Sequence, residues 1–320
     1  MIEDKRICVV IPAYNEETQI GNVIKTIPSF IDAIVVVNDA STDKTAKVVS
    51  KYQEKISNLI LLNHDKNKGC GGALVSGYNW ANKNDFDVAI RMDGDGQMNP
   101  DELPKLLTPL VSGQADYVKG NRFFSGKAYE IMPKIRFFGT AFLSLITKIV
   151  SGYWHLSDFQ SGFCGINKKA LKQINWDIMH KGYGQPNDLL ILLNVHNFRV
   201  MDVPIEPIYN VGEISGIRIR KVIFSLGWLL FKRFFWRLKE KYVIRDFHPL
   251  VFFYGFGILS GGISFLLFIR VFYMWIMTQH IPAINALAAF SSFIASVQFS
   301  LFAMWFDMEA NKEFKGEGGY

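Results

Sequence analysis

Two long apolar runs near the C-terminus constrain the fold of this chain most strongly. Residues 250–277 carry a single charged side chain, Arg270. A helix of that length, at about 1.5 Å of rise per residue, exceeds the roughly 30 Å hydrocarbon core of a membrane. A second apolar run, residues 283–306, follows after a short turn. The sequence therefore predicts a transmembrane hairpin over residues 249–307, because the length and low charge of both runs disfavour a pair of buried core helices.

The rest of the chain is too polar for an all-membrane protein. Of the 320 residues, 49% are hydrophobic and 20% are charged, which indicates a globular domain joined to the apolar hairpin. Three cysteines, Cys8, Cys70 and Cys164, lack the spacing of a metal site, and their odd number favours a reducing compartment. The first residues lead directly into an apolar strand, so we expect no secretory signal peptide.

Positive charge is concentrated just before the first apolar run. The net charge is +6, and residues 215–248 interleave basic side chains with Phe, Leu and Trp. This pattern predicts amphipathic juxtamembrane helices that contact anionic lipid headgroups, in preference to nucleic acid. The turn between the apolar runs contains no Lys or Arg, so the positive-inside rule assigns residues 1–214 and the tail, residues 308–320, to the cytoplasm. We therefore expect an integral protein of the cytoplasmic membrane.

Residues 1–214 alternate short β-branched strands with amphipathic helical stretches. The near-continuous apolar runs indicate strands covered on both faces, and hence a mostly parallel sheet in an α/β domain. Ligands of such sheets bind beyond the carboxyl ends of the strands, where Tyr14, Asp39 and Asp93 all lie. These positions favour one shared site. The predicted strands are residues 7–11, 33–37, 59–62, 88–92, 117–119 and 200–203.

The segment Asp93-Gly94-Asp95-Gly96-Gln97 directly follows the strand predicted at residues 88–92. Its two carboxylates and one amide oxygen alternate with glycines, so all three can face one divalent cation. Mg²⁺ and Mn²⁺ prefer oxygen ligands, and Mg²⁺ usually combines one or two carboxylates with phosphate oxygens of its substrate. A calcium EF-hand is excluded, because Met98 and Pro104 occupy the positions of its glycine and glutamate.

Five segments, taken in chain order, resemble one known family. They are similar to the inverting glycosyltransferases of the GT-A fold that transfer a sugar to a polyisoprenyl phosphate, such as dolichyl-phosphate mannose synthase and the undecaprenyl-phosphate glucosyltransferases. The resemblance implies a GT-A nucleotide-sugar-binding domain over residues 1–214, followed by membrane helices. The segments are residues 11–17 (Ile-Pro-Ala-Tyr-Asn-Glu-Glu), 37–43 (Val-Asn-Asp-Ala-Ser-Thr-Asp), 93–97, 120–122 (Gly-Asn-Arg) and 160–163 (Gln-Ser-Gly-Phe).

The resemblance also implies the roles of particular residues. A divalent metal, Mg²⁺ or Mn²⁺, is expected at Asp93, Asp95 and Gln97. The nucleotide sugar is expected at Pro12, Tyr14, Glu16, Asp39, Asp93, Gly94, Asp95, Ser161 and Gly162. The acceptor phosphate is expected at Arg122, Arg136, Thr140, Ser215 and Arg218. The catalytic residues are expected to be Asp93, Asp95, Arg122 and Asp188. The charges that flank Ser215 depart from the family pattern, which leaves open whether Arg218 or Lys221 contacts phosphate.

The acceptor decides whether a general base is needed. A phosphate monoester has a second pKa of about 6, so at neutral pH it can attack the anomeric carbon without losing a proton. The sequence shows no Ser-His-Asp or Cys-His arrangement, which agrees with such an acceptor. Asp188 would then position sugar hydroxyls. With a hydroxyl acceptor, Asp188 would instead act as the base.

The sequence thus predicts a membrane-anchored, metal-dependent hexosyltransferase. It would move a sugar from a UDP- or GDP-sugar to a polyisoprenyl phosphate, giving a lipid-phosphate-sugar donor for glycoconjugate assembly. The expected partners are the nucleotide sugar, the lipid and the membrane, without nucleic acid; a homo-oligomer stays open. Two alternatives remain: a glycosyltransferase with a hydroxyl acceptor on a protein, glycan or other lipid, and a non-catalytic membrane scaffold. A processive polysaccharide synthase is disfavoured, because the sequence lacks a Gln-x-x-Arg-Trp signature.

Overall fold

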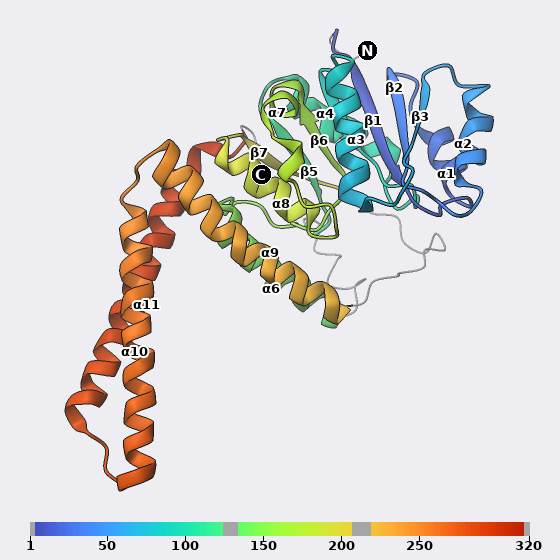
Figure 1. The fold of residues 1–320 in the computed structure, drawn as a ribbon. Coiled ribbons are helices and arrows are strands. Elements are labelled where there is room, and N and C mark those ends of the chain that lie inside the picture. The colour runs from blue at the N-terminus through green and yellow to red at the C-terminus, as the bar shows by residue number, and fades with distance from the viewer. Residues whose placement is uncertain (1–3, 124–133, 207–218, 317–320) are drawn as a thin grey trace. The chain divides into compact units, whose positions relative to one another are not determined.

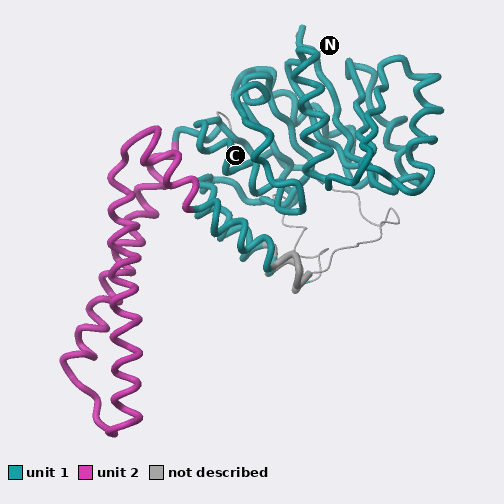
Figure 2. The backbone as a smooth tube through the Cα atoms, viewed as in Figure 1, with its two compact units in different colours: residues 1–234, 313–320 teal, residues 235–312 magenta. Residues whose placement is uncertain are grey.

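The computed structural model describes residues 4–123, 134–206 and 219–316 of the chain. They form two compact units, coloured separately in Figure 2. Unit 1 contains residues 1–234 and 313–320, and unit 2 contains residues 235–312. The boundary at residue 234 falls inside the helix α9 (Ile219–Lys239), within the segment predicted to lie next to the membrane.

Unit 1 is built around one seven-stranded sheet (Figure 1). The strand order is β3-β2-β1-β4-β6-β5-β7, and every neighbouring pair is parallel except the two pairs that contain β6. The mostly parallel α/β sheet predicted from the sequence is therefore confirmed. The strands are β1 Ile7–Ala13, β2 Ala33–Asn38, β3 Leu59–Asn63, β4 Val88–Arg91, β5 Tyr117–Asn121, β6 Cys164–Asn167 and β7 Val200–Pro204.

The strand β6 was not predicted from the sequence. It has four residues and one of them is Gly165, so it offers neither a long apolar run nor an alternating pattern. Because β6 runs antiparallel, it begins at the edge where β4 and β5 end. Cys164 pairs with Arg91 on one side and with Lys119 on the other. The residues just before β6 therefore join the carboxyl ends of the parallel strands.

Helices complete unit 1 and bury the centre of the sheet. β1 and β2 are buried at every position, as expected of parallel strands covered on both faces. Short 3₁₀ turns occur at Pro100–Glu102 and Trp176–Ile178. The α-helices before α9 are α1 Ile20–Thr26, α2 Thr45–Gln53, α3 Gly69–Lys83, α4 Leu103–Val111, α6 Lys134–Ser151, α7 Lys168–Gln173 and α8 Gln185–Val195.

The C-terminal segment returns to the sheet of unit 1. Lys315 forms an isolated parallel bridge with Val200 of β7, and the Gly316 N–H donates to the Val200 carbonyl at 3.2 Å. A 3₁₀ turn at Lys312–Phe314 precedes this contact. The tail predicted at residues 308–320 thus has a described part that pairs with the sheet.

Unit 2 is dominated by two long apolar helices, α10 (Leu250–Thr278) and α11 (Ala283–Ala310), which pack together as a hairpin (Figure 1). Both are long and apolar enough to cross a membrane. Only 22% of the most apolar window of α10 and 11% of that of α11 is buried, whereas a core helix of a soluble protein is mostly buried. The two helices therefore suit a membrane anchor.

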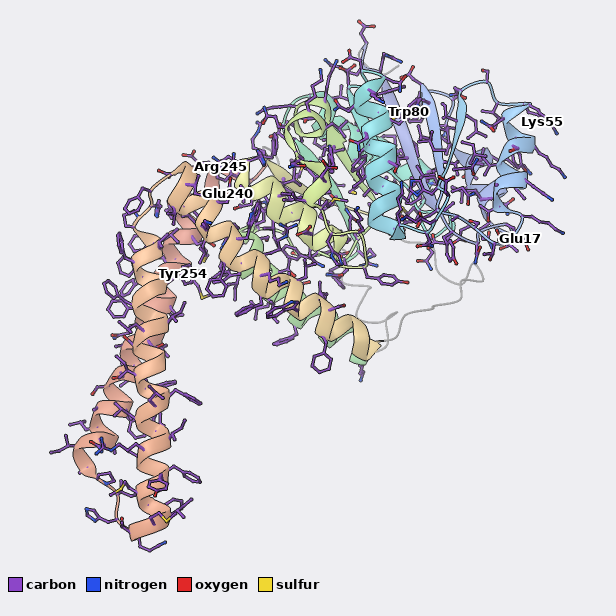
Figure 3. The ribbon with its side chains drawn as sticks, in the orientation of Figure 1. Glu17, Lys55, Trp80, Glu240, Arg245 and Tyr254 are labelled. Atoms are coloured by element: carbon purple, nitrogen blue, oxygen red, sulfur yellow. The ribbon has the colours of Figure 1, made fainter. Side chains whose placement is uncertain are left out.

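Hydrogen bonds and an ion pair hold unit 2 together. Between the apolar helices, the Ser264 hydroxyl donates to the Ala289 carbonyl at 2.9 Å and the Ser296 hydroxyl donates to the Gly257 carbonyl at 2.7 Å. At the end of α9, the fully buried Arg237 pairs with Asp307 of α11 at 2.9 Å. A π-helix at Glu240–Arg245 precedes α10; Glu240, Arg245 and Tyr254 are labelled in Figure 3.

Candidate active site

The loops that follow β1 and β2 are fastened to each other at the carboxyl edge of the sheet. The Asn15 side-chain oxygen accepts from the Thr42 N–H at 2.8 Å, and the Glu16 N–H donates to the Thr45 hydroxyl at 2.8 Å. Glu17, labelled in Figure 3 at this edge, accepts from the Lys44 N–H at 2.9 Å. Several polar residues of the first two motifs therefore shape the loops, while Tyr14 stays 47% exposed.

Asp39, the residue that follows β2, is buried and tied to the start of α3. One of its carboxylate oxygens accepts from the Lys68 N–H at 2.8 Å and lies 2.6 Å from Nδ1 of His64. The other ring nitrogen of His64 lies 2.8 Å from the Ser76 hydroxyl. Sequence reasoning did not identify His64, whose contact with Asp39 spans 25 positions. The predicted nucleotide residue Asp39 thus has a fixed orientation.

Asp93 is held by a buried arginine from the end of the preceding strand, β4. Nε and Nη2 of Arg91 donate to the two Asp93 oxygens at 2.8 and 3.1 Å, and Nη1 donates to the Gln185 side chain at 2.8 Å. A Cβ atom added at Gly162 would lie 2.8 Å from an Asp93 oxygen and 3.0 Å from Nη2 of Arg91, so a larger residue would displace this pair. The predicted residues Asp93 and Gly162 therefore meet. Sequence reasoning missed Arg91, although a charge inside an apolar strand is a signal that it needs a buried partner.

The acidic groups around Asp93 are close enough to influence one another. Burial, followed by the negative charges of Asp95, Asp93 and Asp43, raises the pKa of Glu16 to about 7. Asp95 also accepts a hydrogen bond from the backbone N–H of Gln97 at 3.1 Å. An added Cβ at Gly94 would lie 3.4 Å from Cγ of Glu16. The predicted residues Glu16, Gly94 and Asp95 thus gather beside Asp93.

This set of donors fits Mg²⁺ or Mn²⁺. In the part of the chain that the structure describes, no group of three or more His, Cys, Asp or Glu side chains is arranged to hold a metal ion by itself. Mg²⁺ in a phosphate-transfer site usually takes only one or two carboxylates, with phosphate oxygens and water completing the shell. Burial contributes most to the raised pKa of Glu16, and the neighbouring carboxylates contribute the rest through a repulsion that a bound cation would relieve.

Arg122 follows β5 and is fixed by a fully buried carboxylate. Its Nε and Nη2 donate to the two oxygens of Asp158 at 2.7 and 2.9 Å. Burial alone would raise the pKa of Asp158, but hydrogen bonds and charge from Arg122, together with the charge of Lys119, lower it below its usual value. The buried ammonium of Lys119 donates to the Asp158 carbonyl. Sequence reasoning missed both Asp158 and Lys119.

Asp188 lies in α8 and has no exposed surface. Nε of Arg233 lies 2.5 Å from one of its oxygens, while Nη2 of Arg233 and the His180 N–H donate to the other at 2.9 and 2.7 Å. By contrast, the Asp93 side chain is 27% exposed. The catalytic role expected of Asp188 stays a prediction, and the structure adds an arginine partner that the sequence did not indicate.

The remaining predicted residues fall into three groups. Pro12 lies near the end of β1, and Ser161 is buried just before β6. Arg136 and Thr140 lie in α6, but their side chains are outside the described part of the chain. Ser215 and Arg218 lie outside the described residues altogether. The structure therefore brings Glu16, Asp93, Gly94, Asp95 and Gly162 together, while most of the predicted acceptor residues stay undescribed.

Residues 8–174 match the family described as Glycosyl transferase family 2. This match covers more than half of the chain, so the chain belongs to that family, and it is a glycosyltransferase. The resemblance to this family predicted from the motifs is confirmed.

Similar proteins include enzymes that are named for polyprenyl lipids. A UDP-N-acetylglucosamine–dolichyl-phosphate N-acetylglucosaminyltransferase of Methanococcus voltae is 33% identical over 72% of this chain and 95% of its own length. An undecaprenyl-phosphate mannosyltransferase of Micrococcus luteus is 30% identical over 62% of this chain and 82% of its own length.

A solved structure shares the fold. Glucosyl-3-phosphoglycerate synthase from Mycobacterium tuberculosis, solved in complex with Mg²⁺ and UDP, superimposes with a TM-score of 0.54. The match covers 73% of this chain and 79% of that protein at 19% identity. The identity is too low for more than a conclusion about fold, and the predicted GT-A fold is confirmed.

Proposed function

We propose that this glycosyltransferase moves a sugar, with inversion, from a nucleotide sugar to a polyisoprenyl phosphate at the cytoplasmic face of a membrane. One observation carries the proposal: the acidic cluster at Asp93 and Asp95 and the fixed cation of Arg122 lie at the same edge of the sheet. The acidic cluster suits a metal ion bound to a nucleoside diphosphate, and Arg122 suits another substrate that is anionic. Relatives that are named for dolichyl and undecaprenyl phosphates support this assignment.

On the donor side, Pro12, Tyr14, Glu16 and Asp39 hold the nucleotide, and Ser161 and Gly162 border the diphosphate. Asp93, Asp95 and Gln97 would hold Mg²⁺ or Mn²⁺, which would supply positive charge to stabilise the departing diphosphate. Arg91 holds the Asp93 carboxylate in a fixed orientation, since it donates to both carboxylate oxygens. The chain itself therefore contributes orientation and electrostatics.

On the acceptor side, Arg122 holds the lipid phosphate in line with the anomeric carbon. A phosphate oxygen forms the new bond to that carbon as the bond to the diphosphate breaks, and the electron pair leaves with the diphosphate. The acceptor is already ionised, so no protein base has to remove a proton. The burial of Asp188 and its pairing with Arg233 support this step, because the carboxylate has no exposed surface and contacts Arg233 through both oxygens.

The two apolar helices anchor the enzyme in the membrane. We assign residues 1–214 to the catalytic domain, 215–248 to the juxtamembrane segment, 249–307 to the transmembrane hairpin and 308–320 to the tail. Two spans return the chain to its starting side, which agrees with the pairing of Lys315 with β7. The basic residues of the juxtamembrane segment favour the cytoplasmic side.

A transfer assay tests this function. Membranes containing the chain are incubated with a panel of labelled UDP- and GDP-sugars, and the label is followed in the lipid fraction. We expect a labelled lipid whose sugar is released by mild acid and whose formation requires added polyisoprenyl phosphate. Label in protein or glycan instead would favour a hydroxyl acceptor, and absence of transfer from every donor would favour a scaffold.

A further inference from the structure

The helix α9 presents two different faces within unit 1. Leu226 and Leu230 are buried, whereas Phe224, Trp228 and Phe231 are 81%, 59% and 56% exposed. Lys232 is also exposed, and its ammonium lies 4.9 Å from the Trp228 ring centroid. Aromatic side chains next to basic ones, just before two helices that suit a membrane, are typical of a helix that lies in the headgroup layer. The buried face therefore lies on the domain while the exposed face suits lipid.

The buried face of α9 packs against residues 178–184, the segment that leads into α8. A Cβ atom added at Gly184 would lie 2.5 Å from a methyl carbon of Leu229, so α9 packs directly on this glycine. One turn further along α9, Arg233 donates to the Ile178 carbonyl at 2.5 Å. Its Nε and Nη2 contact the two carboxylate oxygens of Asp188. The Asp188 carboxylate also accepts from the His180 N–H. One arginine of α9 thereby fixes both ends of residues 178–188.

This same segment packs against the start of α3, which in turn contacts the predicted nucleotide residue Asp39. The Lys181 carbonyl accepts from the Gly71 N–H at 3.0 Å, and a Cβ at Gly71 would lie 2.5 Å from the His180 carbonyl. The residues that open α3 include Lys68, whose N–H donates to the predicted nucleotide residue Asp39. A shift of residues 178–184 would therefore move the start of α3.

A second route leads from the same segment to the metal site. Gln185, the first residue of α8, accepts from Nη1 of Arg91 at 2.8 Å. Arg91 holds both oxygens of Asp93. Arg233 is thus connected to Asp93 without a gap. Arg233 pairs with Asp188, which lies three residues after Gln185 in α8, and Gln185 and Asp93 both accept from Arg91.

We infer that Arg233 is a positioning residue, which couples the membrane-facing helix α9 to the donor site through Asp188 and residues 178–185. This inference rests on the proposed function. Arg233 holds Asp188, and with it residues 178–185, in the arrangement that binds the donor. Contact of the exposed face of α9 with anionic lipid stabilises this arrangement further. A purely structural ion pair would stabilise the fold and leave the affinity for the nucleotide unchanged.

The test measures the affinity of the full chain in neutral-lipid nanodiscs for Mn²⁺ with UDP and for Mn²⁺ with GDP by calorimetry. We expect Arg233→Met to weaken binding of the nucleotide that the wild type prefers by at least about fivefold, the lower range of typical coupling between sites. Arg233→Lys keeps the positive charge but cannot donate to both carboxylate oxygens in parallel, so its nucleotide affinity should lie between those of Arg233→Met and the wild type. The control Lys172→Met removes a lysine that pairs with Asp85 at 3.5 Å, outside α9 and the donor site, and should bind as the wild type does.

A second measurement uses nanodiscs with anionic lipid. The wild type should bind the nucleotide more tightly there than in neutral discs, and Arg233→Met should lose that difference. The inference would be overturned, and the proposed function left intact, by either of two results. One is wild-type nucleotide affinity in Arg233→Met, and the other is a gain in affinity on anionic lipid as large in Arg233→Met as in the wild type. If the wild type binds neither nucleotide, the proposed function fails and the inference falls with it.

Folding has to be controlled, because removing Arg233 leaves a buried carboxylate without its counter-ion. The double variant Arg233→Met/Asp188→Leu removes both charges and avoids that penalty. We expect it to fold, by circular dichroism and thermal unfolding, and still to show the weakened nucleotide affinity. A folded double variant with wild-type affinity would equally overturn the coupling.

Discussion

Asp158 accepts three hydrogen bonds from Arg122, from Nε, Nη2 and the backbone N–H, at 2.7, 2.9 and 3.2 Å. Asp158 is fully buried 36 positions away in the sequence, just before β6. A planar guanidinium held along one edge by a carboxylate cannot turn without breaking charged hydrogen bonds. Arg122 is therefore a cation of fixed position at the end of β5, in contrast to a long surface side chain.

From this arrangement we predict that Arg122→Ala impairs the use of the acceptor. The loss of transition-state stabilisation should be on the order of 2–4 kcal/mol, comparable to removing one preorganised donor from an anion site. The defect should appear in kinetics with varied lipid phosphate, while the KM for the sugar nucleotide stays close to that of the wild type. Asp158→Asn should show the same selectivity with a smaller loss, because it loosens Arg122 without removing it.

Asp188→Asn provides the contrast. If the acceptor is a pre-ionised phosphate, this variant should lose much less kcat than the ~10²–10⁴-fold typical of removing a general base. The reverse pattern, with Asp188 indispensable for kcat and Arg122 dispensable, would contradict a phosphate acceptor and favour a hydroxyl.

The metal site gives a second prediction. Asp95→Asn should leave the protein folded and reduce turnover by at least about 100-fold, because the departing diphosphate loses its cation. EDTA should mimic the substitution in the wild type, and added Mg²⁺ or Mn²⁺ should restore activity. Full activity of Asp95→Asn in the presence of chelator would contradict the assignment of Asp95 as a metal ligand.

The sequence was most informative where chemistry is local. Continuous apolar runs predicted six strands, and polar residues at strand ends predicted a common edge, since both patterns depend on neighbouring residues. The two apolar helices were also predictable, because length and absence of charge suffice. The order of the motifs was enough to recognise the family.

The partners that orient the site could not be predicted in the same way. Arg122 meets Asp158 across 36 positions and Asp188 meets Arg233 across 45, and no spacing rule connects such residues. These pairs exist because the antiparallel β6 and the helix α9 bring distant segments to one edge, which is a consequence of tertiary packing. A buried charge in the sequence signals that a partner is needed, but it does not identify the partner.

His155 gives a third prediction, on stability. Its Nε2 donates to the Val200 carbonyl at 2.9 Å, and burial, reinforced by the charges of Lys315 and Lys148, lowers its pKa from 6.5 to about 4. Between those pH values the unfolded chain binds a proton that the folded chain does not, so the free energy of unfolding falls as the pH falls. The full effect is on the order of 3 kcal/mol.

The measurement compares the wild type with His155→Gln. The melting temperature of the wild type should fall more steeply between pH 6.5 and pH 4 than that of the variant. Asp202, whose pKa burial raises to about 6, acts in the opposite sense in both proteins and cancels in the comparison. If the melting temperatures of the two proteins fall equally with pH, His155 is not buried in its neutral form.

The last prediction concerns the topology of the membrane hairpin. Lys315, beyond α11, pairs with Val200 in the sheet of unit 1, so the chain has to return to the side on which the catalytic domain lies. Single cysteines at Gln279, in the turn between α10 and α11, and at Lys312, after α11, can be probed with a membrane-impermeant thiol reagent in intact cells, in a background without the native cysteines. The cysteine at Gln279 should react from outside, and the one at Lys312 should react only after the membrane is permeabilised. Equal labelling of both positions in intact cells would mean that α10 and α11 do not form two complete spans, and the exposed aromatic face of α9 would then be the leading candidate for the anchor.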